Sequence, residues 1–464
     1  MIADLKPYPE YKESGLPWLL HVPSTWKVVR NGSLFGQRNQ TGYEALPILE
    51  VSLKTGVRVR NFENSTRKQV MSDFGKYKHA ARGDVAYNTM RMWQGAVGVS
   101  PVDGLVSPAY VVARPYPDVE PRFFVALFRT DDYMSEIDNC SRGIVKDRNR
   151  LYWDQFKQIL SPCPPPAEQA AIVRFLDWAN GRLERAIRAK RKVIALLGEQ
   201  KQAIIHRAVT RGLDPSVPLK PSGIPWLGDI PQHWEVKRLK AIAQIRYGLG
   251  QPPRESETGL PLIRATNVDQ GKILEKNMVR VDPADVPKTR NAFLKAGEII
   301  VVRSGALTAD SAIIPEKYEG AVAGYDMVVT VRSARAEFIA MALLSSYVQS
   351  DQLVIASMRA AQPHLNAEEL GTAILLLPPD EEQKQVVEFV RSESSPIDTA
   401  ISRLEREIEL LREYRTRLVA DVVTGKLDVR EAAARLPDEV APDRAGDDTD
   451  LSLDHEAADE EAAV

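Results

Sequence analysis

The clearest hydrophobic pattern in this sequence is a seven-residue repeat that occurs in two separate stretches. In the later stretch, apolar residues occupy every seventh position and a companion set between them: Val390, Ile397, Leu404, Leu411 and Leu418, with Ile401, Ile408 and Val422. The earlier stretch repeats this arrangement, interrupted by Lys190: Leu176, Leu183, Leu197 and Ile204, with Ile187, Ile194 and Ala208. Such a repeat is typical of paired helices in a coiled coil. The sequence therefore predicts two long helices that pair with each other.

The later helix is predicted to begin near Ser395. A serine followed by a proline suits an N-cap and a first turn, and the charge of Asp398 is favourable in the opening turn. A short helix from Glu381 would then precede the long one. From Pro396 to Val422 the long helix would have 27 residues, or about 40 Å of length.

Short apolar runs precede each helical stretch and predict strands. They are separated by Gly, Pro and Asn residues and include 46–51, 109–112, 298–302 and 327–331. Each series ends at a proline cluster, Pro162 to Pro166 or Pro378 with Pro379, which terminates regular structure. The sequence thus predicts a compact α/β or α+β domain before each long helix.

The chain contains an internal duplication. The segment from Ser14 to Leu19 recurs from Ser222 to Leu227, at numbers higher by 208, and the Pro, Trp, Val and Arg residues that follow keep their spacing. From Leu46 onward the offset becomes 214 and holds to the two Leu-Asp pairs at 213–214 and 427–428. A register kept over about 170 residues indicates two equivalent halves. We expect an approximate twofold arrangement.

Charge is unevenly distributed along the chain. The formal net charge is −2, yet the segment 438–461 alone carries eleven acidic residues and one arginine, so the remainder is close to +8. A moderately basic body suits a polyanionic partner, whereas the acidic tail is too polar to form a core and is predicted to be disordered. No long apolar run or signal peptide is apparent, and Cys140 and Cys163 are too few for a disulfide framework. These features predict a cytoplasmic protein.

Signatures of catalysis are missing from the sequence. The closest approach to the Asp/Asn-Pro-Pro-aromatic tetrad of adenine methyltransferases is 107–110, Ser-Pro-Ala-Tyr, which lacks the second proline and a glycine-rich cofactor loop. The acidic residues of 379–384 are too close together for a nuclease of the PD-(D/E)xK type, and no phosphate-binding loop occurs. The six histidines are scattered, without the spacing of metal ligands. We therefore expect no catalytic residue and no metal site.

Taken together, the repeated motifs resemble the specificity subunits of type I restriction-modification enzymes. The motifs are the paired Gly-(Leu/Ile)-Pro-Trp segments at 15–18 and 223–226, the Pro-Pro and Glu-Gln junctions, and the two Val-Thr to Leu-Asp helix exits; they extend over about residues 10–430. The resemblance implies target recognition domains at 1–161 and 215–377, spacer helix regions at 162–214 and 378–430, and an acidic tail at 431–464.

The resemblance also implies partners and cofactors. Each recognition domain would bind one half of a split DNA target, the spacer helices would dock two methyltransferase subunits, and restriction subunits would join them. This chain would bind no cofactor itself: S-adenosylmethionine would belong to the methyltransferase partner, and ATP with Mg²⁺ to the restriction partner. The alternative is a DNA-binding scaffold or regulator of the same architecture without a methyltransferase partner. Neighbouring reading frames that encode such a partner would favour the first hypothesis.

Candidate DNA-binding residues are those whose side chains form hydrogen bonds with base edges or grip phosphates. In the first half they are Asn88, Arg91, Gln94, Arg142, Lys146, Arg148 and Arg150, and in the second half Arg264, Asn267, Lys288, Arg290, Arg303, Arg359 and Gln362. The two sets differ at equivalent positions, which predicts an asymmetric target.

Two further sets are assigned to the scaffold. The spacer and docking role falls to ten helix residues: Leu183, Ile187, Ile194, Leu197, Ile204, Ile397, Leu404, Ile408, Leu411 and Leu418. Trp18, Trp26, Trp226 and Trp234 recur at identical spacing in domains that must recognise different sequences. We therefore expect the tryptophans to pack in the core rather than to stack on bases.

Overall fold

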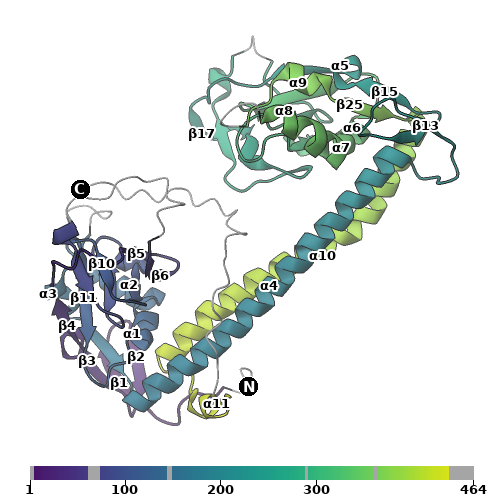
Figure 1. Ribbon diagram of the computed structural model, residues 1–464. Coiled ribbons are helices and arrows are strands. Elements are labelled where there is room, and N and C mark those ends of the chain that lie inside the picture. Colours follow the sequence, from purple (N-terminus) through teal and green to yellow (C-terminus); the bar gives the residue numbers. More distant parts are fainter. Residues whose placement is uncertain (1–4, 61–73, 144–148, 288–290, 359–362, 438–464) are drawn as a thin grey trace. The chain divides into compact units, whose positions relative to one another are not determined.

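The computed structural model describes residues 5–60, 74–143, 149–287, 291–358 and 363–437 (Figure 1). The chain forms two compact units: unit 1 comprises 1–189 and 407–464, and unit 2 comprises 190–406. The segment 1–161 therefore falls in unit 1 and 215–377 in unit 2, while each spacer region is divided between the units. The exact domain boundaries stay a prediction.

Unit 1 is built on a four-stranded antiparallel sheet in the order β4-β11-β8-β9. The strands are β4 (Phe35–Arg38), β8 (Val85–Asn88), β9 (Val97–Val99) and β11 (Tyr110–Pro115). Helix α1 (Pro121–Phe128) places the buried side chains of Phe123, Phe124 and Phe128 in the same core as Phe35. These aromatic contacts form the main core of the unit.

Smaller pairs of strands surround this sheet. They are β1 (Tyr11–Leu16) with β2 (Leu19–Pro23), β3 (Lys27–Arg30) with β12 (Leu160–Cys163), β5 (Leu49–Ser52) with β6 (Gly56–Val59), and β7 (Lys78–Ala80) with β10 (Gly104–Val106). The helices are α2 (Asp131–Cys140), α3 (Trp153–Phe156) and α11 (Arg430–Ala434), with short 3₁₀ turns at 31–33, 74–76 and 92–94.

Unit 2 repeats the central sheet in the order β16-β24-β21-β22. Its strands are β16 (Ala243–Tyr247), β21 (Ile299–Val301), β22 (Ser311–Ile313) and β24 (Met327–Val331), again antiparallel. Strands β16, β21 and β22 correspond to β4, β8 and β9 at the offsets 208 and 214, and the pairing in the sheet aligns β24 with β11 at an offset of 216. The predicted duplication and the predicted mixture of strands and helices are therefore confirmed.

The remaining elements of unit 2 cover this sheet. They are the strands β13 (Leu219–Pro221), β14 (Asp229–Pro231), β15 (Glu235–Arg238), β17 (Glu255–Ile263), β18 (Val268–Asp269), β19 (Lys272–Ile273), β20 (Val279–Val281), β23 (Val322–Ala323) and β25 (Ile374–Leu377), and the helices α5 (Leu239–Ile242), α6 (Ala336–Leu344), α7 (Ser346–Val348), α8 (Ile355–Ser357) and α9 (Ala367–Thr372). A π-helical turn at 349–354 and 3₁₀ turns at 265–267, 283–285 and 316–318 complete the unit.

Within the described ranges, no single helix has the length and apolar composition to cross a membrane, although 336–344 together with 346–357 would pass as a bent pair. Most of α6 is buried in the core of unit 2.

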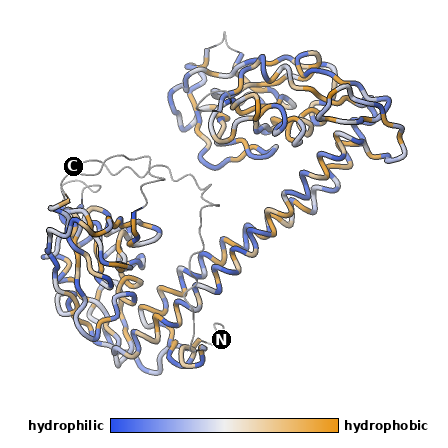
Figure 2. The backbone as a smooth tube through the Cα atoms, viewed as in Figure 1, coloured by the Kyte–Doolittle hydropathy of each residue, from blue (hydrophilic) through white to orange (hydrophobic). Residues whose placement is uncertain are grey.

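The two predicted long helices are α4 (Pro166–Arg211) and α10 (Asp380–Val423). In unit 1 the guanidinium of Arg415 lies 3.2 Å from the carboxylate of Glu184, and in unit 2 the ammonium of Lys201 lies 2.9 Å from that of Asp398. These two ion pairs are equivalent at the offset of 214. Within each unit the helices run antiparallel, and apolar and polar residues alternate along both (Figure 2).

The predicted start of the later helix was wrong. Helix α10 is continuous from Asp380, with Pro396 inside it. An internal proline removes a backbone N–H and crowds the preceding turn, which costs about 3 kcal/mol or more. However, Val390 and Ile397, one heptad apart on either side of the proline, are both buried. We infer that this packing outweighs the cost, and Asp398 pairs with Lys201 instead of capping a helix start.

A tryptophan in each unit explains the Glu-Gln motif. In unit 1 the indole N–H of Trp26 donates to Glu168 (2.8 Å), and in unit 2 that of Trp234 donates to Glu382 (3.0 Å). Both indoles are fully buried. The following glutamines, Gln169 and Gln383, donate to the carbonyls of Pro164 and Pro378, each at 2.8 Å. The motif therefore attaches the start of a long helix to its domain.

In each unit, the other long helix ends close to the same buried tryptophan: α10 ends near Trp26 and α4 near Trp234. Gly212 follows α4 and Gly425 follows α10, both with positive φ (+73° and +78°), as is common just after a helix. A Cβ atom at Gly212 would lie 3.2 Å from the ring of Trp234, and one at Gly425 would lie 2.5 Å from Pro23. The positive φ favours glycine at both positions, and at Gly425 there is also no room for a Cβ atom.

The other two tryptophans do not behave alike. Trp18 is half-buried and packs edge-on against Tyr133, whose ring centroid is 5.3 Å away. Trp226 is 49% exposed, so the prediction that it packs in the core was wrong. The strands of its hairpin, β13 and β14, are three residues long, whereas β1 and β2 are six and five residues long. We attribute the exposure to this shorter hairpin.

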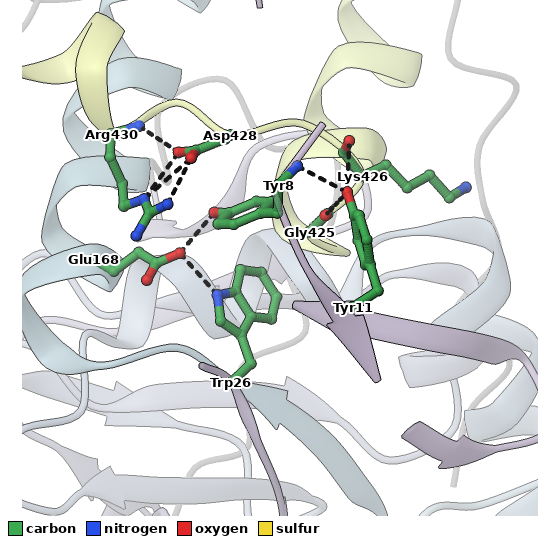
Figure 3. Close-up of polar contacts among 8 residues, drawn as sticks. All are labelled: Tyr8, Tyr11, Trp26, Glu168, Gly425, Lys426, Asp428 and Arg430. Carbon is green, nitrogen blue, oxygen red and sulfur yellow. Dashed lines mark hydrogen bonds and ion pairs between the residues drawn. The ribbon is translucent and has the colours of Figure 1, made fainter. Parts of the chain in front are cut away.

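In unit 1 the two ends of the described chain meet at Glu168 (Figure 3). The hydroxyl of Tyr8 donates to the same Glu168 oxygen as Trp26, at 2.6 Å, and the pKa of Tyr8 is raised by burial and by this bond. Asp428 donates its backbone N–H to the carbonyl of Lys6 at 2.8 Å, and Arg430 lies over the Tyr8 ring. After α4 the chain continues through Gly212 into the strands of unit 2. After α10, the corresponding link to the strands of unit 1 is made by these non-covalent contacts.

A buried ion pair is also duplicated within the two sheets. Arg38 contacts Asp84 in unit 1, and Arg246 contacts Glu298 in unit 2, both at 2.6 Å. The arginines correspond at the offset of 208 and the acids at 214. Burial disfavours the Glu298 carboxylate, but bonds from Arg246 and Thr330 outweigh this effect, so the pKa of Glu298 is lowered. The pair therefore belongs to the common scaffold.

Candidate nucleic-acid interface

In unit 1, several predicted DNA-binding residues gather at one edge of the central sheet. Strand β8 ends at Asn88 and leads into the 3₁₀ turn at 92–94, which brings Arg91 and Gln94 to this edge. The segment that holds Arg142 and Arg150 joins them there, because Leu151 donates its N–H to the carbonyl of Thr89 at 2.9 Å. Arg142 and Arg150 pair with each other through two backbone hydrogen bonds, 3.0 and 2.9 Å long.

The side chains at this edge are not equally accessible. Gln94 and Arg142 are exposed, and Arg91 and Arg150 are half-buried. Asn88 is 7% exposed, and its side-chain oxygen accepts the N–H of Met90 at 2.9 Å. The structure thus argues against Asn88 as a base contact, because its amide is used to form a turn at the end of the strand.

Unit 2 has an equivalent edge with different side chains. Leu365 donates to the carbonyl of Arg303 at 2.7 Å, which repeats the Leu151–Thr89 bond at an offset of 214. The guanidinium carbon of Arg303 lies over the rings of Tyr247 and Tyr325, at 4.7 and 4.3 Å from their centroids. Its Nη2 atom is 2.8 Å from Nε2 of His364. Arg303 was predicted from the sequence to bind DNA, whereas Tyr247 and Tyr325 were not.

A buried carboxylate connects this edge to the segment that begins at Arg264. Asp326 is 2% exposed and accepts backbone N–H bonds from Arg303, at 3.2 Å, and from Ala265. Burial raises the pKa of Asp326 to about 6, against the lowering effect of these bonds and of the Arg303 charge. The structure thus brings Arg264 and Arg303, distant in sequence, to one edge.

Arg264 and Asn267 hold each other in a capped 3₁₀ turn. The backbone N–H of Arg264 donates to the Asn267 side chain at 3.2 Å, and Arg264 Nη2 donates to the carbonyl of Asn277 at 2.9 Å. Asn267 is fully buried and donates to the carbonyls of Leu274 and Lys276. The prediction of a base contact at Asn267 is therefore contradicted, because its amide is already bonded inside the unit.

Six predicted DNA-binding residues lie outside the described residues: Lys146, Arg148, Lys288, Arg290, Arg359 and Gln362. Their role stays a prediction. By sequence, Arg148 and Gln362 occupy equivalent positions, and each precedes the leucine that bonds to the sheet edge, Leu151 or Leu365.

The residues predicted for spacing and docking lie along the helix pair. Leu183, Ile187, Ile397, Ile408 and Leu418 are buried. Half-buried positions complete the stripe: Ile194, Leu197, Ile204, Leu404 and Leu411.

Two leucines outside this stripe are exposed at equivalent positions, Leu196 (52%) and Leu410 (47%). Their spacing of 214 residues is visible in the sequence, but the heptad pattern predicts only the buried stripe and does not single out exposed positions.

Metal-binding groups of three or more His, Cys, Asp or Glu residues do not occur in the part of the chain that the structure describes.

Comparisons with known proteins agree with these features. Residues 231–410 match the type I restriction modification DNA specificity domain. The chain is 26% identical over 285 residues to the MjaVIII type I restriction enzyme specificity subunit of Methanocaldococcus jannaschii, covering 59% of this chain and 64% of that protein. It is 22% identical over 325 residues to the EcoKI specificity subunit of Escherichia coli K12, covering 68% of each. The matched regions thus span about two thirds of these relatives.

One solved structure supports the fold. It was described in work on complex assembly and conformational transition of the type I restriction-modification system, and it aligns with a TM-score of 0.59 at 15% identity. The alignment covers 88% of this chain and 99% of the other. The resemblance to type I specificity subunits and the predicted fold class are confirmed.

Proposed function

Because this chain is related to the specificity subunits of type I restriction enzymes, we propose that it binds a split, asymmetric DNA target and directs catalytic partners to it. Each unit would recognise one short word of the target through the edge of its central sheet. The chain itself would contribute no catalytic residue and would hold no cofactor.

One observation carries this proposal: the two units have the same scaffold but different side chains at the equivalent edge. The bond from Leu151 to Thr89 is repeated by that from Leu365 to Arg303. The arginine of unit 2 thus occupies the position of a threonine in unit 1. Since arginine and threonine differ in the base edges that they bind, an unequal pair of words is expected.

The proposed partners are two methyltransferase subunits, with restriction subunits joining the complex. The methyltransferases would supply S-adenosylmethionine chemistry and flip an adenine out of each half of the target. The restriction subunits would supply ATP-dependent cleavage. The helices α4 and α10 would set the number of base pairs between the two words, as the resemblance implies.

The duplicated exposed leucines suggest where two copies of one partner dock. Leu196 on α4 and Leu410 on α10 are about half exposed at equivalent positions, so two copies of one partner would cover them in the same way. Replacing either leucine by glutamate is expected to weaken binding of one methyltransferase copy at least tenfold, or about 1.4 kcal/mol, because a charge would be buried without a partner. The exposed Leu274 (36%) of unit 2 offers a control position.

Native mass spectrometry of the assembled complex would measure this effect. Each single variant should shift the population to one methyltransferase per specificity chain, and the double variant should bind none. Retention of two copies by both single variants would place the docking surface elsewhere.

The function itself is tested by selecting DNA from a random library with the assembled complex and footprinting the selected sites. The proposal predicts two protected words separated by a gap of constant length and free sequence. Selection of a single uninterrupted word, or of no sequence at all, would contradict it.

A further inference from the structure

The arrangement around Arg303 is more elaborate than a phosphate contact requires. The guanidinium contacts two tyrosine rings that remain 38% and 48% exposed, Tyr247 and Tyr325. Strand β16 ends at Tyr247, and β24 begins two residues after Tyr325, so both rings lie at the same end of the central sheet. Contact with two aromatic rings restricts the orientation of the guanidinium, and its Nη groups stay available for hydrogen bonding.

Hydrogen bonds fix the position of Arg303 further. Its backbone N–H donates to Asp326, and its carbonyl accepts the N–H of Leu365. Its Nη2 atom lies 2.8 Å from Nε2 of His364, and because arginine only donates, Nε2 must be the acceptor and the ring proton must lie on Nδ1. Backbone and side chain are therefore both held in one orientation.

The charge of this guanidinium is not neutralised by an ion pair. Among the residues that the structure describes, no carboxylate forms an ion pair with Arg303, and its Nε atom is buried without a hydrogen-bond partner, so only its Nη groups can reach an acceptor outside the chain. Asp326, the nearby acid, uses its side chain for backbone N–H groups. Nη groups that are held in one place without an ion-pair partner are suited to an acceptor outside the chain.

Two acceptors in DNA fit an arginine: a phosphate and the O6/N7 edge of guanine. A phosphate can be bound from many directions, whereas the guanine edge demands that the guanidinium plane match that of the base. The contacts of Arg303 with Tyr247, Tyr325 and His364 restrict the orientation of its guanidinium plane. We therefore propose that Arg303 recognises a guanine in the word bound by unit 2, and that both tyrosines are positioning residues for it.

This inference rests on the proposed function and specifies which base is recognised and which unit recognises it. The equivalent positions in unit 1 are Asn39, Thr89 and, by the pairing of the central sheet, Ala109, so these contacts cannot form there. The guanine contact thus belongs to one word of the target.

The test uses the complete chain with its methyltransferase partner and a set of targets in which each position is varied in turn. The wild-type protein should prefer guanine at one position of one word by about 10- to 100-fold. Arg303→Ala should abolish that preference and leave the others. Arg303→Lys, which keeps the charge without the planar fork, should lose most of it. Replacing both tyrosines by leucine should weaken it while Arg303 is still present.

Arg254 provides the matched control, because it is an exposed arginine of the same unit paired with Asp285. Arg254→Ala should leave all base preferences unchanged. Equal loss of affinity on every sequence with Arg303→Ala would identify a phosphate contact, and unchanged preferences would identify a purely structural stack; either result overturns the inference alone. If the wild-type complex selects no split target, the proposed function fails as well.

Discussion

Replacing Trp234 by alanine is expected to lower the free energy of unfolding of unit 2 by about 3–5 kcal/mol. The indole is fully buried and donates to Glu382, which begins α10, and its ring lies against Gly212, which ends α4. The substitution therefore removes one large side chain that both long helices share. For a unit of this size the midpoint of thermal unfolding should fall by roughly 10 °C.

Differential scanning calorimetry of the complete chain measures this effect. Trp226→Ala is the matched control, because the same residue type in the same unit is 49% exposed and should matter little. Trp26→Ala should produce the corresponding loss in unit 1. A change of less than 1 kcal/mol for Trp234→Ala would show that the helix ends are attached to the unit by other contacts.

Replacing Arg246 by methionine should also cost unit 2 about 3–5 kcal/mol, because it leaves the Glu298 carboxylate buried without its ion-pair partner. The Arg246 and Glu298 side chains are 15% and 7% exposed, and the guanidinium also donates to the carbonyls of Asn291 and Phe293. The double replacement Arg246→Met with Glu298→Leu should be less damaging than the single one, because no charge is then buried alone.

Chemical denaturation at neutral pH, followed by unit-specific fluorescence, measures both variants. The exposed arginine of the Arg254–Asp285 pair serves again as the control, and Arg254→Met should change little. Since the pKa of Glu298 is lowered in the folded state, its contribution should be present at neutral pH and be lost as the pH falls through that value. A pH-independent penalty for Arg246→Met would contradict the assigned role of the ion pair.

The scaffold was predictable from the sequence because duplication marks it twice. Equivalent spacing located Trp26 and Trp234, and the same spacing would have revealed the Arg38–Asp84 and Arg246–Glu298 pairs had charged residues been compared at both offsets. Heptad spacing alone was sufficient for the two long helices. The heptad pattern does not predict the tertiary packing that keeps α10 helical at Pro396.

The candidate interface was harder to predict, because residue type does not reveal how a side chain is used. Asn88 and Asn267 have amides suited to adenine, but both are committed to turns within the chain. Tyr247 and Tyr325 were missed because three strands must assemble before they meet Arg303. Only the fold distinguishes such groups from other polar loop residues.

The central claim, that two units bind two words at a separation set by the helices, is tested most directly by lengthening those helices. One heptad would be inserted at equivalent positions, after Lys192 in α4 and after Arg406 in α10, so that the apolar stripe keeps its register. Targets selected by this variant should contain the same two words as wild type with a gap longer by roughly three base pairs. An unchanged gap, or new words, would contradict the account.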